Sequence, residues 1–165
     1  MVQLYLIRHG VAEPKGEAWP DDRKRPLSDA GIKQMRKASR GLERLGAGIE
    51  LILTSPLVRT VQTAEIVAAA FGSKPVVQTT NALAPRGPYT TLLTELAKHD
   101  QLTRIALVGH EPSIGDIARH LMKSGRRLDF KKGGVCRIDV DALPPTGRGD
   151  LRWFVPPAIL RSIRG

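Results

Sequence analysis

The chain has 165 residues, of which 41% are hydrophobic and 25% are charged, and these values predict a single globular domain over residues 1–165. Its one cysteine, Cys136, excludes an internal disulfide and is compatible with a reducing cytoplasm. The sequence has neither the pattern of a signal peptide nor an apolar run of membrane-spanning length, so we expect a cytoplasmic protein without a membrane partner.

The formal net charge of +10 favours anionic partners such as nucleic acid, lipid head groups or phosphorylated ligands. Short basic clusters occur at residues 23–25, 126–127 and 131–132. We expect most of these clusters to be solvated surface. Because no aromatic residues are interleaved with them, we predict no nucleic-acid partner.

Strand-like and helix-like segments alternate along the first three quarters of the chain. Short apolar runs predict strands at residues 3–7, 50–55, 74–78 and 103–109. Helical spacing and end signals predict helices at residues 27–46, 56–72, 87–99 and 111–123. Beyond them, period-two alternation around a turn-rich segment predicts a hairpin of residues 134–143 and 151–155.

The first two helices carry the clearest end signals. Ser28 is the expected N-cap of helix 27–46, and Gly46 its expected end. Its expected buried face comprises Ile32, Met35, Leu42 and Leu45. Helix 56–72 is expected to begin with Ser55 as cap and Pro56 in the first turn, and to end at Gly72.

Strands that alternate with helices predict an α/β fold, a three-layer α/β/α sandwich whose mainly parallel sheet has an antiparallel C-terminal element. In such sheets ligands bind at the carboxyl ends of the strands. Arg8 and His9 end the first strand, Arg59 lies just after the second, and His110 ends the fourth. Two arginines and two histidines at one sheet edge predict a pocket for a phosphoryl group.

The segments "LIRHG", "TSPLVRTVQTAEI" and "LVGHEPSIG" resemble, in this order, the signature segments of the histidine phosphatase superfamily, which has the phosphoglycerate-mutase-like fold. The segment "NALAPRG" and the short chain narrow the resemblance to its SixA-type phosphohistidine phosphatases. The resemblance covers roughly the first 120 residues. It implies that His9 is the nucleophile and that Arg8, Arg59 and His110 bind the phosphate. Because the strand ends carry no cluster of aspartate and histidine ligands, we expect neither a metal nor a cofactor.

The residues themselves agree with these roles. A neutral imidazole is a competent nucleophile, and neighbouring arginines disfavour its protonation while they neutralise charge on the transferred group. Thr63, one helical turn after Arg59, either orients the Arg59 guanidinium or simply packs there. His99 and His120 lie outside the motifs and are expected to be structural.

The segment after the third strand, where larger mutase-type members carry a glutamate as general acid, has no carboxylate before Glu95. Glu13 and Glu111 are the remaining candidates for an acid, although neither position matches the family motif. Without an acid, the leaving group must leave easily, as the imidazole of phosphohistidine does.

These observations predict a metal-independent phosphatase that hydrolyses phosphohistidine on a protein partner through a covalent intermediate on His9. A small-molecule phosphomonoesterase with the same pocket stays open as an alternative, and a mutase is a weaker one because it needs a site enclosed against water. A non-catalytic module that binds phosphate or nucleic acid is the alternative from another class. The sequence leaves the oligomeric state open.

Overall fold

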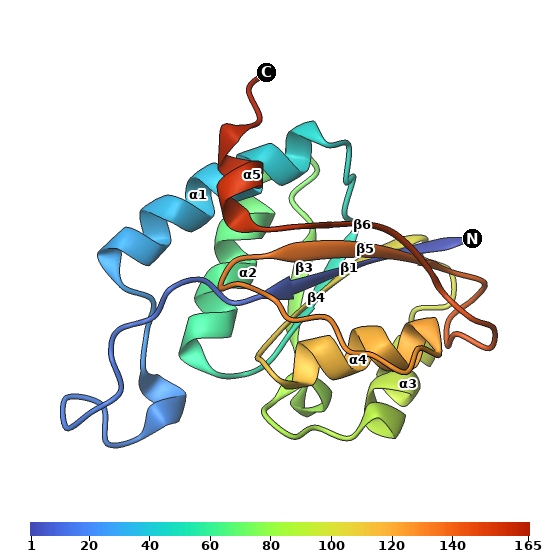
Figure 1. Cartoon of the computed structure of the whole chain (residues 1–165), viewed down its shortest axis with the longest axis horizontal. Coiled ribbons are helices and arrows are strands. Elements are labelled where there is room, and N and C mark those ends of the chain that lie inside the picture. The colour runs from blue at the N-terminus through green and yellow to red at the C-terminus, as the bar shows by residue number, and fades with distance from the viewer.

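The computed structural model describes residues 1–165 and contains one six-stranded sheet between two layers of helices (Figure 1). The strands are β1 (Val2–Arg8), β2 (Leu51–Thr54), β3 (Val76–Thr79), β4 (Arg104–Gly109), β5 (Val135–Val140) and β6 (Asp150–Val155). The α-helices are α1 (Asp29–Arg44), α2 (Val58–Ala70), α3 (Tyr89–Ala97), α4 (Ser113–Met122) and α5 (Pro157–Ser162). Two short 3-10 helices are η1 (Asp22–Lys24) and η2 (Asn81–Leu83). The predicted three-layer α/β architecture is confirmed.

The strand order is β3-β2-β4-β1-β5-β6. Strands β1 to β4 are parallel, β5 runs antiparallel to β1, and β6 runs antiparallel to β5. This confirms the predicted mainly parallel sheet with an antiparallel C-terminal element. The central strand β1 pairs with β4 on one side and β5 on the other, so that Leu6 lies between Leu107 and Cys136.

Side chains alternate between the two faces of the sheet and form two separate apolar clusters. In β1, Leu4 and Leu6 face the cluster covered by α3 and α4, whereas Tyr5 and Ile7 face the cluster covered by α1, α2 and α5. Both faces of the central strands are therefore buried, which fixes the position of their carboxyl ends. None of the helices has both the length and the apolarity needed to cross a bilayer.

Helix α1 begins and ends as its sequence indicates. The Ser28 hydroxyl accepts a hydrogen bond from the Gly31 N–H at 3.0 Å, and Gly46 turns the chain after the last residues with a φ of +79°. Met35 and Leu42 are buried as expected, whereas Ile32 is only half-buried. Leu45 is 44% exposed, contrary to expectation, because it lies beyond the last helical residue where the chain already leaves the core.

Helix α2 starts later than its sequence indicates. It begins at Val58, and its N-cap residue, Leu57, provides no side-chain cap. The prediction that Ser55 and Pro56 begin the helix was wrong, because the chain bends at Pro56 and Leu57 before the helix starts, and the Ser55 hydroxyl contacts a histidine as well as the Leu57 N–H.

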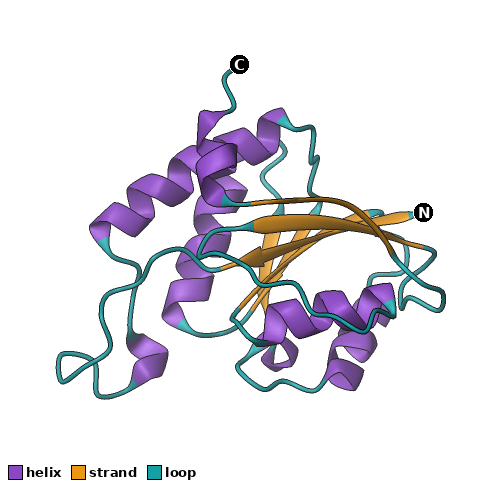
Figure 2. Cartoon of the chain, in the orientation of Figure 1, coloured by secondary structure: helices purple, strands orange, loops and turns teal.

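Helix α5 was not predicted, since six residues carry little periodic signal. It packs on α1 at Gly41, where a Cβ atom would lie 1.9 Å from the Leu160 carbonyl oxygen. The only local signal for this helix is Pro157 in its first turn. Figure 2 also shows the long connection between β1 and α1, residues 9–28, which carries η1 and extends away from the sheet.

Candidate active site

A pocket of about 460 Å³ opens at the carboxyl ends of β1 and β4, and its lining is almost entirely polar or charged. Arg8, His9, Arg59 and His110 all contribute to this lining. Arg8 ends β1, His9 follows it directly, Arg59 lies in α2 and His110 follows β4, so parallel strand topology brings together residues that are up to about a hundred positions apart. The predicted convergence on one sheet edge is confirmed as geometry.

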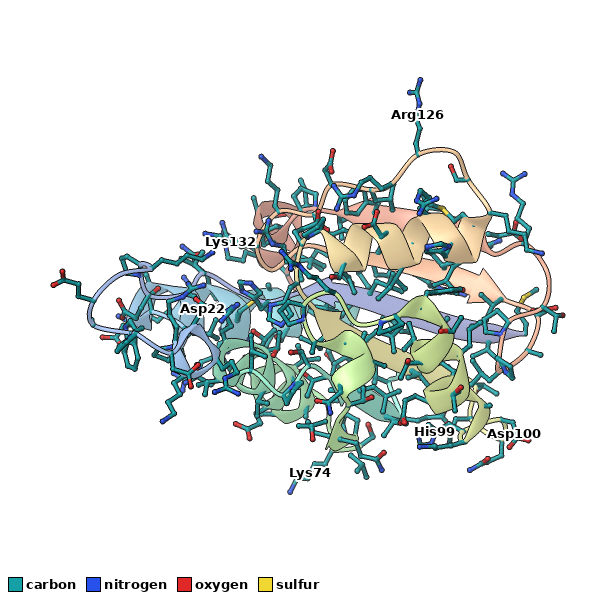
Figure 3. All side chains as sticks on the ribbon, turned by 90° about the horizontal axis from the view of Figure 1, so that it is seen from below. Asp22, Lys74, His99, Asp100, Arg126 and Lys132 are labelled. Carbon is teal, nitrogen blue, oxygen red and sulfur yellow. The ribbon has the colours of Figure 1, made fainter.

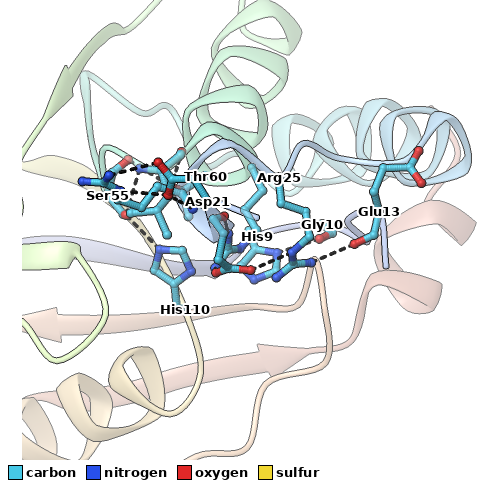
Figure 4. A network of polar contacts seen from close by, with 12 residues as sticks. His9, Gly10, Glu13, Asp21, Arg25, Ser55, Thr60 and His110 are labelled. Atoms are coloured by element: carbon cyan, nitrogen blue, oxygen red, sulfur yellow. Dashed lines mark hydrogen bonds and ion pairs between the residues drawn. The ribbon is translucent and has the colours of Figure 1, made fainter. Parts of the chain in front are cut away.

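His9 is buried directly after β1, and hydrogen bonds fix its orientation. Its ring Nδ1 lies 2.7 Å from the Gly10 carbonyl oxygen (Figure 4). Because a carbonyl oxygen only accepts hydrogen bonds, Nδ1 carries the proton and Nε2 keeps its lone pair. Burial lowers the pKa of His9 to about 4, with further contributions from the nearby Arg59, Arg8 and Arg25 guanidinium groups. His9 is thus a neutral imidazole with an available Nε2.

His110 lies beside His9, with 5.3 Å between the ring centroids. Its Nε2 is 2.8 Å from the Ser55 hydroxyl, whereas its buried Nδ1 has no hydrogen-bond partner. Burial and the neighbouring His9 lower the pKa of His110 to about 3, so this ring is neutral as well.

Arg8 and Arg59 bring positive charge to the two histidines. The Arg8 guanidinium donates to the Phe130 carbonyl at 2.7 Å, and the Arg59 guanidinium donates to the main chain and the carboxylate of Asp22 at 2.8 and 3.0 Å. In both arginines the buried Nε–H has no partner. Together with Nδ1 of His110, three buried nitrogens at one pocket lack a partner, and only one other buried side-chain atom, the Ser39 hydroxyl, shares this property. Buried donors are normally satisfied, so this pocket fits an anion.

The loop between β1 and α1 supplies two pocket residues that sequence reasoning missed. Asp22 accepts from Arg25 at 2.8 Å as well as from Arg59, and these guanidinium groups lower the pKa of the Asp22 carboxyl. Arg25 is only 8% exposed and also donates to the Glu13 carbonyl at 2.8 Å. Arg25 is therefore an exception to the solvated surface expected for most of the basic clusters. The missed signal is an aspartate three residues before an arginine, in a segment flanked by Pro20 and Pro26.

The two candidate acids, Glu13 and Glu111, line the pocket, but neither carboxylate faces the histidine rings. Glu111 forms an ion pair with Arg127 and accepts the Gly115 N–H at 3.0 Å, so both of its oxygens are engaged. Glu13 contributes its carbonyl to Arg25, and its carboxylate is directed away from the two histidine rings (Figure 4).

Thr63 has a different role from orienting the Arg59 guanidinium. Its hydroxyl donates to the Arg59 carbonyl at 2.8 Å and accepts the Gly10 N–H at 3.1 Å. The side chain therefore ties α2 to the chain segment just after His9.

The remaining histidines lie outside the pocket. The His120 ring stacks on Tyr89 with 4.5 Å between the centroids. His99 lies beside Asp100 at a distance from Asp22 and Lys132, which mark the pocket side in Figure 3. No group of three or more histidine, cysteine, aspartate or glutamate side chains is arranged to hold a metal ion.

The chain matches known proteins along much of its length. Residues 4–84 match the family model of the histidine phosphatase superfamily, branch 1. An uncharacterized protein of Picosynechococcus is 37% identical over 139 residues, which cover 81% of this chain and 82% of that protein. The phosphohistidine phosphatase SixA of Escherichia coli is 22% identical over 165 residues, or 99% of both chains.

The fold agrees with these sequence matches. The solved structure of the protein histidine phosphatase SixA complexed with tungstate superposes with a TM-score of 0.85 at 23% identity, covering 96% of this chain and 99% of that one. The chain therefore belongs to branch 1 of the histidine phosphatase superfamily, and its phosphoglycerate-mutase-like fold is similar to that of SixA.

Proposed function

We propose that this protein is a metal-independent phosphohistidine phosphatase that transfers the phosphoryl group through His9. The observation that carries the proposal is the set of three buried, unpartnered nitrogens, on Arg8, Arg59 and His110, around a histidine whose Nε2 lone pair is free. A phosphoryl group has three peripheral oxygens that accept hydrogen bonds, and it carries charge that guanidinium groups neutralise.

In the first step, Nε2 of His9 attacks phosphorus and forms a P–N bond, while the bond to the substrate's leaving atom breaks and its electron pair stays on the leaving group. Arg8 and Arg59 neutralise the charge on the peripheral oxygens, which is the largest contribution to phosphoryl transfer. The Gly10 carbonyl holds the proton on Nδ1 and stabilises the positive charge that the ring acquires.

In the second step, water attacks the phosphorus of phosphorylated His9. The P–N bond breaks, its electron pair returns to Nε2, and the water gives up its proton to solvent as inorganic phosphate forms. The guanidinium groups of Arg8 and Arg59 fill the electrostatic role that a metal ion has in other phosphatases. We therefore expect full activity in EDTA.

The substrate class we propose follows from the positions of the pocket carboxylates, none of which can act as a general acid at His9. Glu111 is paired with Arg127, Asp22 is shared by two arginines, and the Glu13 carboxylate is directed away from the rings, so none is free to protonate a leaving group at His9. When the other ring nitrogen of phosphohistidine is protonated, the ring leaves as neutral imidazole and needs no enzyme acid. Imidazole is a good leaving group because the pKa of a histidine side chain is ordinarily about 6.5. An alkoxide would need the missing acid. The name of the E. coli relative, phosphohistidine phosphatase SixA, supports the same class.

The partner we propose is a phosphorylated protein. Lys15 and Lys132 lie at the edge of the pocket, are exposed and form no ion pair, so they add positive charge around the opening. Exposed charges are screened by salt, so affinity for a phosphorylated protein should weaken as ionic strength rises.

The decisive experiment measures kcat/KM for phosphohistidine peptide, aryl phosphates of graded leaving-group pKa, and sugar and serine phosphates, each with and without EDTA. We expect a steep decrease as leaving-group pKa rises, and no effect of EDTA. Equal rates with alkyl phosphates would instead favour the small-molecule phosphomonoesterase. Activity that EDTA removes and magnesium restores would overturn metal independence, and no turnover of any substrate would favour a phosphate-binding module.

A further inference from the structure

Ser55 is a fully buried residue next to the catalytic pocket that none of the proposed steps uses. It follows β2 directly, and its main-chain N–H donates to the Val108 carbonyl at 3.0 Å, so the sheet fixes its position. Its hydroxyl lies 2.8 Å from Nε2 of His110 (Figure 4). A hydroxyl held so rigidly against a histidine can control where that ring carries its proton.

The hydrogen bonds around Ser55 indicate the direction of this contact. The Ser55 oxygen accepts the Leu57 N–H at 3.3 Å, and its own proton has no acceptor other than Nε2 of His110. If Nε2 carried a proton and donated it to Ser55, the Ser55 proton would be buried without a partner, which is costly. Ser55 therefore donates, and Nε2 is the unprotonated nitrogen.

The proton of neutral His110 then lies on Nδ1, which is the buried nitrogen without a partner. We propose that Ser55 is a positioning residue that sets the tautomer of His110, so that the ring presents an N–H donor to a phosphoryl oxygen. With the other tautomer, a lone pair would face the anion and repel it. The link to catalysis rests on the proposed function, whereas the tautomer itself does not.

Two neighbouring histidines would thus present opposite groups to the same phosphoryl group. His9 carries its proton on Nδ1 through the Gly10 carbonyl and offers the Nε2 lone pair to phosphorus. His110 accepts from Ser55 at Nε2 and offers the Nδ1 proton to oxygen. Both rings are buried and neutral. The Gly10 carbonyl behind His9 and the Ser55 hydroxyl behind His110 would therefore decide which ring acts as nucleophile and which as hydrogen-bond donor.

The first test is made on the unmodified protein. Imidazole nitrogen NMR of ¹⁵N-labelled protein at pH 7 distinguishes protonated from unprotonated ring nitrogens, and His110→Asn assigns the signals. We expect protonated Nδ1 and unprotonated Nε2 in His110, with Nδ1 shifting when inorganic tungstate is added. A protonated Nε2 in the free protein would overturn the proposal.

The second test compares substitutions of Ser55 and Thr60, two buried residues where the chain passes from β2 into α2. Ser55→Ala should abolish the preference for one tautomer, weaken tungstate binding, and lower kcat/KM by about tenfold, the effect of one lost hydrogen bond. Ser55→Thr retains the hydroxyl and should retain the tautomer. Thr60→Val is the matched control, because the Thr60 hydroxyl is buried in the same turn and donates only to the Ser55 and Leu57 carbonyls.

The outcomes separate this proposal from the proposed function. An unchanged His110 tautomer in Ser55→Ala, or an equal loss of activity in Thr60→Val, would overturn the positioning role. If the tautomer is as expected but no phosphorylated substrate turns over, the proposed function fails while the assignment of the His110 proton stands.

Discussion

Two regions form the pocket, and they hold their side chains in different ways. At the sheet edge, main-chain hydrogen bonds fix His9: its N–H donates to the Gly109 carbonyl at 3.0 Å, and its carbonyl accepts from Gly133 at 2.9 Å. In the front loop, residues 11–28, Asp22 and Arg25 are fixed through their own side chains. The sheet edge thus supplies rigid groups for chemistry, while the loop supplies charge that orients them.

The largest effect is expected from the sheet edge itself. His9→Ala should lower kcat/KM by at least about 10³-fold, because no other group presents a nucleophilic nitrogen to the phosphoryl position. Brief exposure to labelled phosphohistidine peptide should leave an acid-labile phosphoryl group on the unmodified protein and none on the variant. His99→Ala, outside the pocket, is the control. Undiminished turnover in His9→Ala would show that the phosphoryl group is not transferred through this residue.

Arg59 connects the two regions, since it extends from α2 into the pocket and binds Asp22 of the front loop. Arg59→Ala should lower kcat/KM by about 10²–10³-fold, because a buried donor to the transferred group is lost. Far-ultraviolet circular dichroism should stay unchanged. Arg36→Ala on the exposed face of α1 serves as the matched control. A loss below threefold would mean that Arg59 binds the loop alone and not the phosphoryl group.

The buried histidines should make stability depend on pH in a defined direction. In the folded protein the pKa is about 4 for His9 and about 3 for His110, whereas in the unfolded chain it is near 6.5. Between these values the unfolded chain binds more protons, so the free energy of unfolding falls as pH decreases below about 6.5. We expect a loss on the order of 2–4 kcal/mol between pH 7 and pH 5.

Urea unfolding at each pH measures this loss. In a variant with His9→Gln and His110→Gln, the free energy of unfolding should depend much less on pH, because the two buried histidines are absent. A flat profile in the unmodified protein would contradict the neutral, buried state of both rings.

The smallest effects are expected from the carboxylates of the front loop. Asp22→Asn should lower kcat/KM by about tenfold, since Arg59 keeps its contact with the Asp22 carbonyl but loses the charged partner that fixes its fork. Glu13→Gln is the matched control and should stay within about twofold, because only the main chain of Glu13 is used. A rate increase in Asp22→Asn would show that removing negative charge outweighs the loss of orientation.

The same contrast explains what the sequence could predict. Arg8, His9 and His110 lie at the ends of apolar runs, where parallel topology by itself brings side chains to a common edge. Arg23, Lys24 and Arg25 are consecutive basic residues, yet only Arg25 is buried, because a loop without periodicity folds according to contacts with distant residues such as Asp22 and Glu13. Ser55 precedes a proline as helix caps often do, but its hydroxyl is taken by His110, a contact across 55 positions.

The central place of β1 in the sheet has a consequence for how the protein is made. β1 is synthesised before its neighbours, yet Leu6 pairs with Leu107 on one side and Cys136 on the other. On the ribosome, the strand that leads into His9 therefore stays unpaired until about a hundred further residues have been made. Such distant pairing is slow to form. The proposed nucleophile is consequently positioned late, and a partly made chain carries the Arg-His-Gly motif without the pocket around it.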